Sequence, residues 1–151
     1  MLVLTFRVGQ SRLALDVRQI EAVLPRVALG PAAAGPAWLA GVFVYHGRVV
    51  PVVDLHRLVG AGECPALLSS RIILVPFPGD PAGLVGLLAA HVSDIRDLDE
   101  PPADSSSGDP ELPDLGRMVV GPDGVLHVAS LERLLPASVR SRLAGLSGAA
   151  G

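Results

Sequence analysis

The sequence contains no lysine, a single cysteine and few aromatic residues, and each shortage excludes a class of protein. Without lysine, no phosphate-binding loop of the Gly-Lys-Ser/Thr type can be drawn. The single Cys64 allows neither an internal disulfide nor a cysteine-based zinc cluster. The 12 basic residues are all arginines, spread singly along a chain of formal net charge −3. A nucleic-acid surface needs a basic stripe, so we expect no nucleic-acid partner.

The sequence also lacks an uninterrupted apolar run long enough to span a bilayer, although its mean hydropathy is high at +0.50. The best candidate, residues 72–92, is broken by three prolines and an aspartate, so no helix of about 20 apolar residues fits there. Arg7 and Arg12 stand inside the first apolar stretch, which is not how a signal peptide is built. We therefore expect a cytoplasmic protein without direct membrane insertion.

No catalytic or metal-binding constellation is visible. The four histidines, His46, His56, His91 and His127, are widely spaced, whereas zinc ligands usually come in closer pairs. There is no Gly-x-Ser-x-Gly nucleophile motif. Acidic residues gather around positions 94–100 and could serve acid/base chemistry, but a solvated acidic surface explains them better. We expect no enzyme, no metal and no cofactor, which favours a binding or scaffolding module.

Alternation of apolar and polar residues predicts short strands along most of the chain. The expected strands cover residues 2–8, 12–16, 38–45, 48–53, 71–77, 83–90, 92–98, 115–120 and 125–128, with a helical turn and a strand within 17–24. A helical turn is expected over 55–59, and Ser130 is the predicted N-cap of a helix over 131–135, followed by a turn over 137–143. Residues 99–114, acidic and rich in Ser and Pro, predict a surface loop.

The stretch WLAGVFVYHGRVVPVVDL, residues 38–55, is the most informative part of the chain. It predicts a β-hairpin that turns at His46-Gly47. Pro51 has no N–H to donate to a sheet, so its strand is expected at an edge or a bulge. Many short strands with frequent turns and little helix predict an all-β barrel or a pair of barrels.

Five segments in this order resemble CheW-like proteins, the adaptors that couple chemoreceptors to the histidine kinase CheA. They are FRVGQSRLALDVRQIEAVL, LAGVFVYHGRVVPVVDLHRLVG, RIILVPF, GLVGLLAAHVSDI and GRMVVGPDGVLHVASLERLL. The second segment carries the residues that match the family motif, Gly41, Gly47, Pro51 and Asp54. The resemblance implies an all-β fold of two packed five-stranded SH3-like β-barrels with short helices. It also implies one CheW-like domain over residues 1–143 and a frayed tail over 144–151.

The resemblance further implies a non-enzymatic adaptor that can join membrane-associated receptor arrays. One implied partner is the tip of a methyl-accepting chemoreceptor, bound in a groove between the barrels by Ile20, Tyr45, His46 and Ile95. The other is the regulatory domain of a CheA-type histidine kinase, for which the expected contacts are the barrel-edge residues Leu39, Val42 and Phe43. From periodicity alone, Ile20 and Ile95 would be ordinary core residues.

Two positions depart from the family pattern. His46 stands where the family usually has arginine, so a permanent charge is replaced by an imidazole that titrates near neutral pH. Ala90-His91 replaces a common Asp-Gly. These departures predict an adaptor in an accessory or alternative pathway. The alternative is a degenerate decoy or structural module that occupies array positions without activating a kinase.

Overall fold

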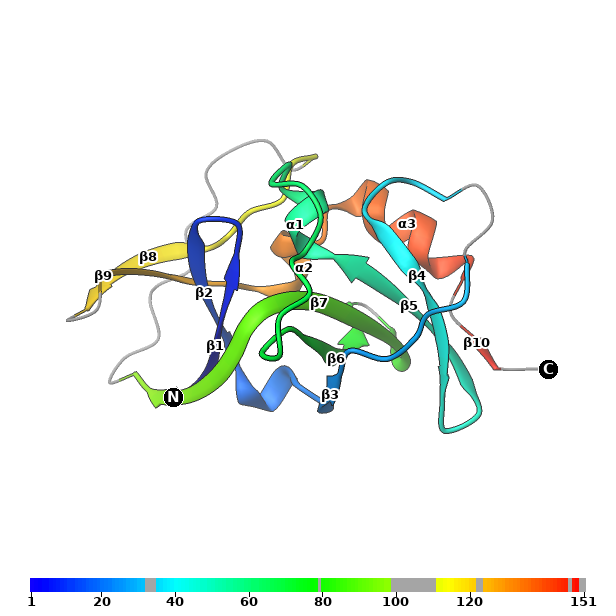
Figure 1. Cartoon of the computed structure of the whole chain (residues 1–151), viewed down its shortest axis with the longest axis horizontal. Helices are drawn as coiled ribbons and strands as arrows, with labels where there is room; N and C mark the ends of the chain where they lie inside the picture. The colour runs from blue at the N-terminus through cyan, green and yellow to red at the C-terminus, as the bar shows by residue number, and fades with distance from the viewer. Residues whose placement is uncertain (32–34, 79, 99–110, 122–123, 147, 150–151) are drawn as a thin grey trace.

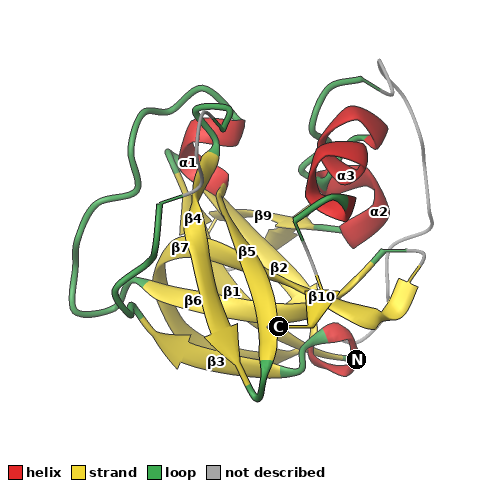
Figure 2. Cartoon of the chain, turned by 90° about the vertical axis from the view of Figure 1, so that its right-hand side faces the viewer, coloured by secondary structure: helices red, strands yellow, loops and turns green. Residues whose placement is uncertain are grey.

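The computed structural model describes residues 1–31, 35–78, 80–98, 111–121, 124–146 and 148–149 (Figure 1). The strands are β1 Leu2–Val8, β2 Ser11–Asp16, β3 Ala22–Pro25, β4 Leu39–Tyr45, β5 Arg48–Asp54, β6 Arg71–Phe77, β7 Asp80–Asp97, β8 Arg117–Gly121, β9 Gly124–Val128 and β10 Gly148–Ala149. The helices are the 3-10 turn η1 Val17–Gln19, α1 Leu55–Leu58, α2 Leu131–Leu134 and α3 Ala137–Ala144. The three α-helices lie at one end of the strands (Figure 2). The predicted all-β fold is confirmed.

The first lobe contains β8, β9, β2, β1 and the second half of β7, hydrogen-bonded in that order. The opening hairpin pairs β1 with β2 from Val3↔Asp16 to Val8↔Ser11. Its alternation places Leu4, Phe6 and Val8 in the core, as the sequence predicts. Strand β9 joins the lobe by pairing in parallel with β2, and β8 then pairs with β9 as the predicted hairpin.

The second lobe contains β4, β5, the first half of β7, β6 and β3. Strands β5 and β7 pair in parallel, whereas the other neighbours run antiparallel. The predicted helical turn and strand within residues 17–24 are confirmed as η1 and β3. A cluster of buried side chains fills this lobe around Val52, Ile72 and Leu88.

Strand β7 belongs to both lobes, which corrects the expectation of two separate strands over 83–90 and 92–98. It runs through 18 residues and pairs with β6 and β5 first, then with β1. The register against β1 shifts between Thr5 and Arg7, and His91 on β7 has a positive φ of 50° there. A bulge thus bends one continuous strand from the second lobe into the first.

One hydrophobic cluster connects the lobes and the helices. Its members come from β1, β2, β5, β6, β7 and all three α-helices, and they include Phe6, Val53, Leu87, Leu134 and Leu143, each at most 2% exposed. Because the cluster takes side chains from both lobes, the two lobes are expected to unfold together. Among the described residues, no helix has both the length and the apolar composition needed to cross a bilayer.

The prediction for Pro51 differs from the structure, whereas the N-cap predicted at Ser130 is confirmed in position. Pro51 lies in β5, an inner strand that pairs with β4 on one side. On its other side, β10 pairs with Arg48 and Val49, whereas β7 pairs with residues 52–54. The missing N–H therefore falls at a gap in the pairing on that side. Ser130 is the N-cap of α2, but its side chain makes no capping hydrogen bond and only its carbonyl accepts bonds from α2.

The C-terminal segment also differs from the expected frayed tail. Ala144 is the last residue of α3, and Gly148 and Ala149 pair with Val49 and Arg48 of β5. At Arg48 and Val49 the side of β5 away from β4 is not paired with β7, so its backbone groups are open to β10. Most of the predicted acidic loop, residues 99–110, lies outside the described residues.

Candidate functional site

The turn between β4 and β5 is formed by His46 and Gly47, with φ of 49° and 77°. Tyr45 pairs with Arg48 across it, so the loop has two residues, and positive φ at both is what such hairpin turns require. The imidazole of His46 stacks on the ring of Tyr45, with centroids 4.1 Å apart and planes 8° from parallel. The hairpin therefore presents an aromatic pair at its exposed tip.

Ile20 and Ile95 lie near β1. Ile20 ends η1, is half-buried and packs against the central cluster. Ile95 pairs with Leu4 in the β1–β7 ladder and is 65% exposed, and Leu2, two residues before Leu4, is 50% exposed. Side chains two apart on a strand share a face, so Leu2 and Ile95 form an apolar surface there. Ile95 is thus exposed, which the periodicity of the sequence does not predict.

A buried cluster connects the hairpin tip to β3, the strand that follows Ile20. Tyr45 packs against a group that contains Val50, Leu74 and Leu84, and Ala22 of β3, two residues after Ile20, packs against that group too. Tyr45 of β4 therefore packs on the same buried cluster as β3, the strand that begins two residues after Ile20. Among the described residues we find no contact between His46 and Ile95. His46 lies in the turn between β4 and β5, and Ile95 lies in the last part of β7.

The three residues expected to bind the kinase do not share one face. Val42 and Phe43 are consecutive in β4, so their side chains point to opposite sides. Phe43 packs on two buried clusters, and its ring lies 3.8 Å from where a Cβ on Gly86 would stand. Leu39 packs against the central cluster at the other end of β4. Leu39 and Phe43 are therefore both partly occupied by core packing.

Gly41 permits a close approach of two chain segments. Its φ is 150°, and a Cβ there would stand 2.6 Å from the carbonyl oxygen of Gly30 and 2.8 Å from Cβ of Leu29. Gly30 exchanges two backbone hydrogen bonds with Val42, at 2.8 and 3.0 Å. Only glycine fits at Gly41, because any side chain would push the segment at residues 29–30 away from β4.

Asp54 ends β5 and holds the segment that follows it. One carboxylate oxygen, Oδ1, accepts hydrogen bonds from the backbone N–H groups of His56 (2.9 Å) and Arg57 (3.3 Å), which caps α1. The other, Oδ2, accepts from the N–H of Cys64 at 3.0 Å. Asp54 is 2% exposed, so this motif residue is a structural anchor.

Two titratable groups beside Asp54 are buried. Burial lowers the pKa of His56 from its ordinary value, and the charge of Asp54 offsets this only in part. The Nδ1 atom of His56 accepts a hydrogen bond from the N–H of Gly9 at 3.1 Å, so the ring is neutral in the fold. Burial raises the pKa of the Cys64 thiol to about 11. The low pKa of His56 and the high pKa of Cys64 favour the neutral form of both groups at neutral pH.

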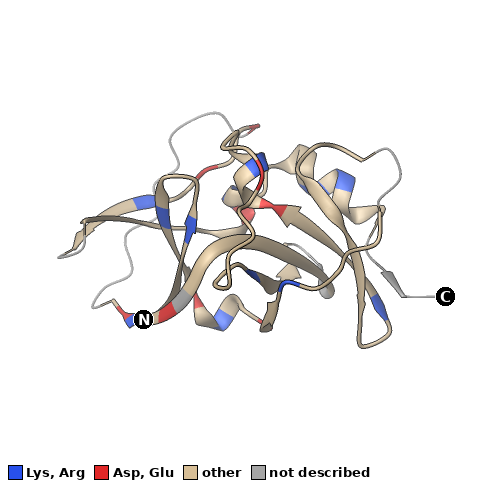
Figure 3. Cartoon of the chain, in the orientation of Figure 1, with Lys and Arg blue, Asp and Glu red and all other residues tan. Residues whose placement is uncertain are grey.

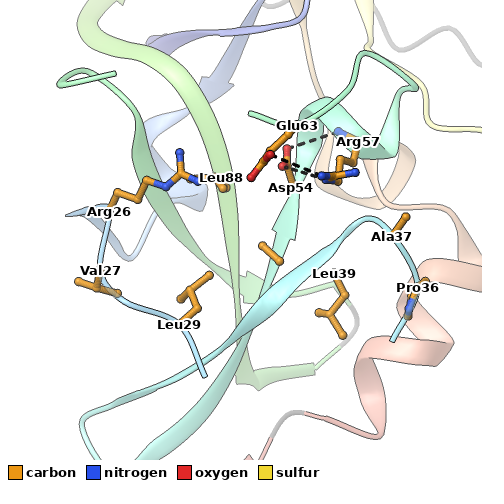
Figure 4. A pocket seen from close by; sticks show the side chains of 11 residues that line it. Arg26, Val27, Leu29, Pro36, Ala37, Leu39, Asp54, Arg57, Glu63 and Leu88 are labelled. Carbon is orange, nitrogen blue, oxygen red and sulfur yellow. Dashed lines mark hydrogen bonds and ion pairs between the residues drawn. The ribbon is translucent and has the colours of Figure 1, made fainter. Parts of the chain in front are cut away.

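A cavity of about 520 Å³ opens next to Asp54, between the segment after β3, the start of β4 and α1 (Figure 4). Its lining residues are Arg26, Val27, Leu29, Pro36, Ala37, Leu39, Ala40, Asp54, Arg57, Glu63 and Leu88. Figure 4 shows Arg26 on one side, with Arg57, Asp54 and Glu63 together on the other. Aliphatic side chains separate the two charged groups.

Sequence reasoning found two of these lining residues, Leu39 and Asp54, and missed the two arginines. Arg26 and Arg57 are 31 positions apart, and neither belongs to a motif. Their only signal in the sequence was position: Arg26 follows a predicted strand and Arg57 lies in a predicted helical turn. Without the fold, nothing indicates that they face one cavity.

Comparison with known proteins identifies the family that shares this architecture. A family model described as CheW-like domain matches residues 2–139. The chain is 33% identical over 95 residues to protein FrzA of Myxococcus xanthus, covering 60% of this chain and 59% of that protein. It is 31% identical over 71 residues to chemotaxis protein CheW of Thermotoga maritima, covering 47% of each. The matches thus span 47% and 59% of the lengths of these curated relatives.

A solved structure shares the fold. The crystal structure of the scaffolding protein TtCheW from Thermoanaerobacter tengcongensis matches with a TM-score of 0.72, covering 91% of this chain and 89% of that one. The two sequences are 22% identical, so this likeness concerns the fold.

Proposed function

Because the chain belongs to the CheW-like domain family of scaffold and adaptor proteins, we propose that it is a non-enzymatic adaptor that couples a chemoreceptor-like protein to a CheA-type histidine kinase. The proposed partners are the tip of a methyl-accepting chemoreceptor and the regulatory domain of the kinase. The departure at His46 favours an accessory or alternative pathway. In this role the protein would join receptor arrays at the membrane through its partners.

The observation that carries this proposal is the exposure of Ile95. Ile95 is 65% exposed although Leu4 opposite it on β1 and Val92 on its own strand are buried, and together with Leu2, which is 50% exposed, it offers an apolar surface to a partner. The apolar surface of Ile95 and Leu2 suits apolar side chains on the outer face of one helix of a receptor coiled coil. Figure 3 shows the arginines distributed over both lobes, with no basic stripe that would suit a nucleic acid.

Capture by a receptor tip tests the proposal. Ile95→Asp should weaken capture of the receptor tip at least about tenfold, because it places an unpaired charge in an apolar contact. Val120→Asp is the matched control: Val120 is 82% exposed on β8, a strand that pairs with β9 and not with β1 or β7. Equal capture by the two variants would remove Ile95 from the receptor site.

A second function is favoured by His46. With no permanent charge at position 46, the chain could occupy array positions as a decoy and activate no kinase. An in vitro array assay separates the two roles, since an adaptor raises kinase activity when the receptor is present and a decoy lowers it. Failure to bind any receptor or CheA-type kinase of its own organism would rule out both.

A further inference from the structure

The outer strand of the β8–β9 hairpin is an open edge of the sheet. Figure 1 shows this hairpin projecting at one end of the first lobe. Strand β8 comes last in the hydrogen-bonded order, and within the part of the chain that the structure describes it pairs only with β9. An open edge offers a row of backbone N–H and C=O groups to another chain. Strand β8 is therefore a surface to which an extended segment can add.

The residues that offer these backbone groups follow from the pairing of β9. The N–H of Ala129 donates to a carbonyl oxygen of β2 at 2.8 Å. Backbone groups of successive residues in a strand point to opposite sides, so Val128 points its groups to β8, where it pairs with Arg117. The same alternation along β8 directs the N–H and C=O groups of Met118 and Val120 away from β9, towards the open edge.

The side chains of these two residues are apolar and exposed. Met118 is 64% exposed and Val120 is 82% exposed, and residues two apart share one face of a strand. Val125 of β9 stands opposite Val120 on that face and is 45% exposed. The open edge and an apolar surface therefore coincide at the end of the hairpin.

Strand β8 lacks the features that usually protect an edge strand from pairing. Such strands commonly carry a lysine, a proline or a bulge. The sequence of β8 is RMVVG, and its register against β9 shows no shift. Its one charged residue, Arg117, is at the first position. The middle of the strand is therefore open to pairing.

The sequence of β8 matches itself when two copies run antiparallel. With the symmetry axis at Val119, Met118 of one copy stands opposite Val120 of the other, and Arg117 stands opposite Gly121. Apolar side chains then face each other and like charges do not. The opposed pair Met118 and Val120 is also the pair whose backbone groups point outwards, so these residues can exchange both hydrogen bonds of an antiparallel pair. A second copy thus has the one edge that the structure shows to be complementary.

We propose that two copies of this chain associate by pairing their β8 strands antiparallel about Val119, which joins the two first lobes into one sheet. This contact needs neither a receptor nor a kinase, so it is independent of the proposed function. In the sheet order, β9 and β2 separate β8 from β1. The exposed Ile95 and Leu2 therefore stay open in each copy, and the dimer presents this apolar surface twice.

Sedimentation velocity of the full chain over a concentration series tests the proposal. Because the contact is one short strand per copy, we expect a weak dimer, half-formed above about 10 µM. Val120→Pro removes an outward N–H and leaves the pairing with β9 intact, since proline is tolerated where the N–H faces solvent. It should weaken dimerisation at least about tenfold.

Val44→Pro is the matched control for the proline variant. The N–H of Val42 donates to Gly30, away from β5, and Val44, two residues further along β4, points its N–H to the same side. Val44 is also exposed. This variant therefore removes a comparable outward N–H from another strand and should dimerise like the unchanged chain. Melting temperatures show whether both variants are folded.

A pair of charge variants tests the register without proline. A mixture of Met118→Glu chains with Val120→Lys chains should associate at least about threefold more tightly than either variant alone, because opposite charges then face each other across the contact. In the matched control, Val125→Lys replaces Val120→Lys, which keeps the charge on the same face but places it on β9, away from the edge. The control mixture should show no such gain.

Each outcome supports or overturns the pairing. Dimerisation that is lost in Val120→Pro, kept in Val44→Pro and strengthened in the Met118→Glu and Val120→Lys mixture supports it. A monomer at every concentration up to about 1 mM overturns it, since even a weak specific contact would be populated there. Equal dimerisation of the two proline variants, or equal gains in both mixtures, overturns the pairing through β8. Binding of the unchanged chain to a receptor and a kinase would stand in each of these cases.

Discussion

The carboxylate of Asp54 binds the backbone N–H of Cys64, 3.0 Å away and ten residues further along the chain. The same carboxylate caps α1 through the N–H groups of His56 and Arg57. One buried side chain therefore fixes both ends of the segment that leaves β5 and carries Glu63 to the rim of the cavity. Both the stability of the fold and the shape of the cavity depend on this side chain.

Replacing Asp54 should destabilise the protein strongly. Asp54→Ala removes the cap of α1, at a cost of about 0.5–2 kcal/mol, and leaves the buried N–H of Cys64 unsatisfied, at about 1–3 kcal/mol. Asp54→Asn keeps one acceptor oxygen and should lose less. Urea unfolding measures both against Asp97→Ala, which alters a side chain that is 73% exposed. Equal free energies of unfolding for the Ala variants of Asp54 and Asp97 would contradict the anchoring role.

Cys64 should react slowly while the protein is folded. Its thiol is 2% exposed and burial raises its pKa to about 11, so roughly one thiol in a thousand is ionised at pH 8. Because the sequence has no other cysteine, the kinetics of iodoacetamide labelling report on this residue alone. We expect labelling to become fast only in denaturant. Comparable rates in folded and unfolded protein would show that the segment after α1 opens readily.

Acid should destabilise the fold through His56. Burial lowers the pKa of this histidine in the folded state, so the unfolded state takes up its proton first as pH falls below about 6.5. The contribution is thus fully present above that pH and declines below it. Free energies of unfolding at pH 7.5 and 5.5 should fall more for the unchanged protein than for His56→Gln, which cannot be protonated. Equal losses would assign the pH dependence to other groups.

Local patterns in the sequence were sufficient for much of the fold. Alternation predicted β1, β2 and β6, and Gly47 after His46 predicted the hairpin turn, because neighbouring residues decide these features. The continuity of β7 through His91 could not be predicted, since a bulge and the end of a strand look alike in sequence. Resemblance to a family supplied the two-lobed arrangement.

The candidate site was less predictable. The exposure of Ile95 depends on what packs over the face of β7, and the cavity depends on bringing Arg26 and Arg57 to its two sides across the second lobe. Gly41 matched a motif, but its role in admitting Leu29 against β4 requires the three-dimensional contact. Tertiary packing, which no local pattern encodes, decides each of these features.

The hairpin tip provides the sharpest test of which signalling role the chain has. His46→Arg restores a permanent charge and a planar fork of donors at the tip, so it should strengthen capture of a receptor tip about threefold or more and raise receptor-dependent kinase activity. His91→Arg is a matched control, because His91 is also exposed and has nearly the same φ, 50° against 49°. The two variants therefore impose a similar backbone strain. A gain confined to position 46 supports the adaptor role with a weakened receptor contact, whereas no gain, or equal gains at both positions, would remove the hairpin tip from the receptor site.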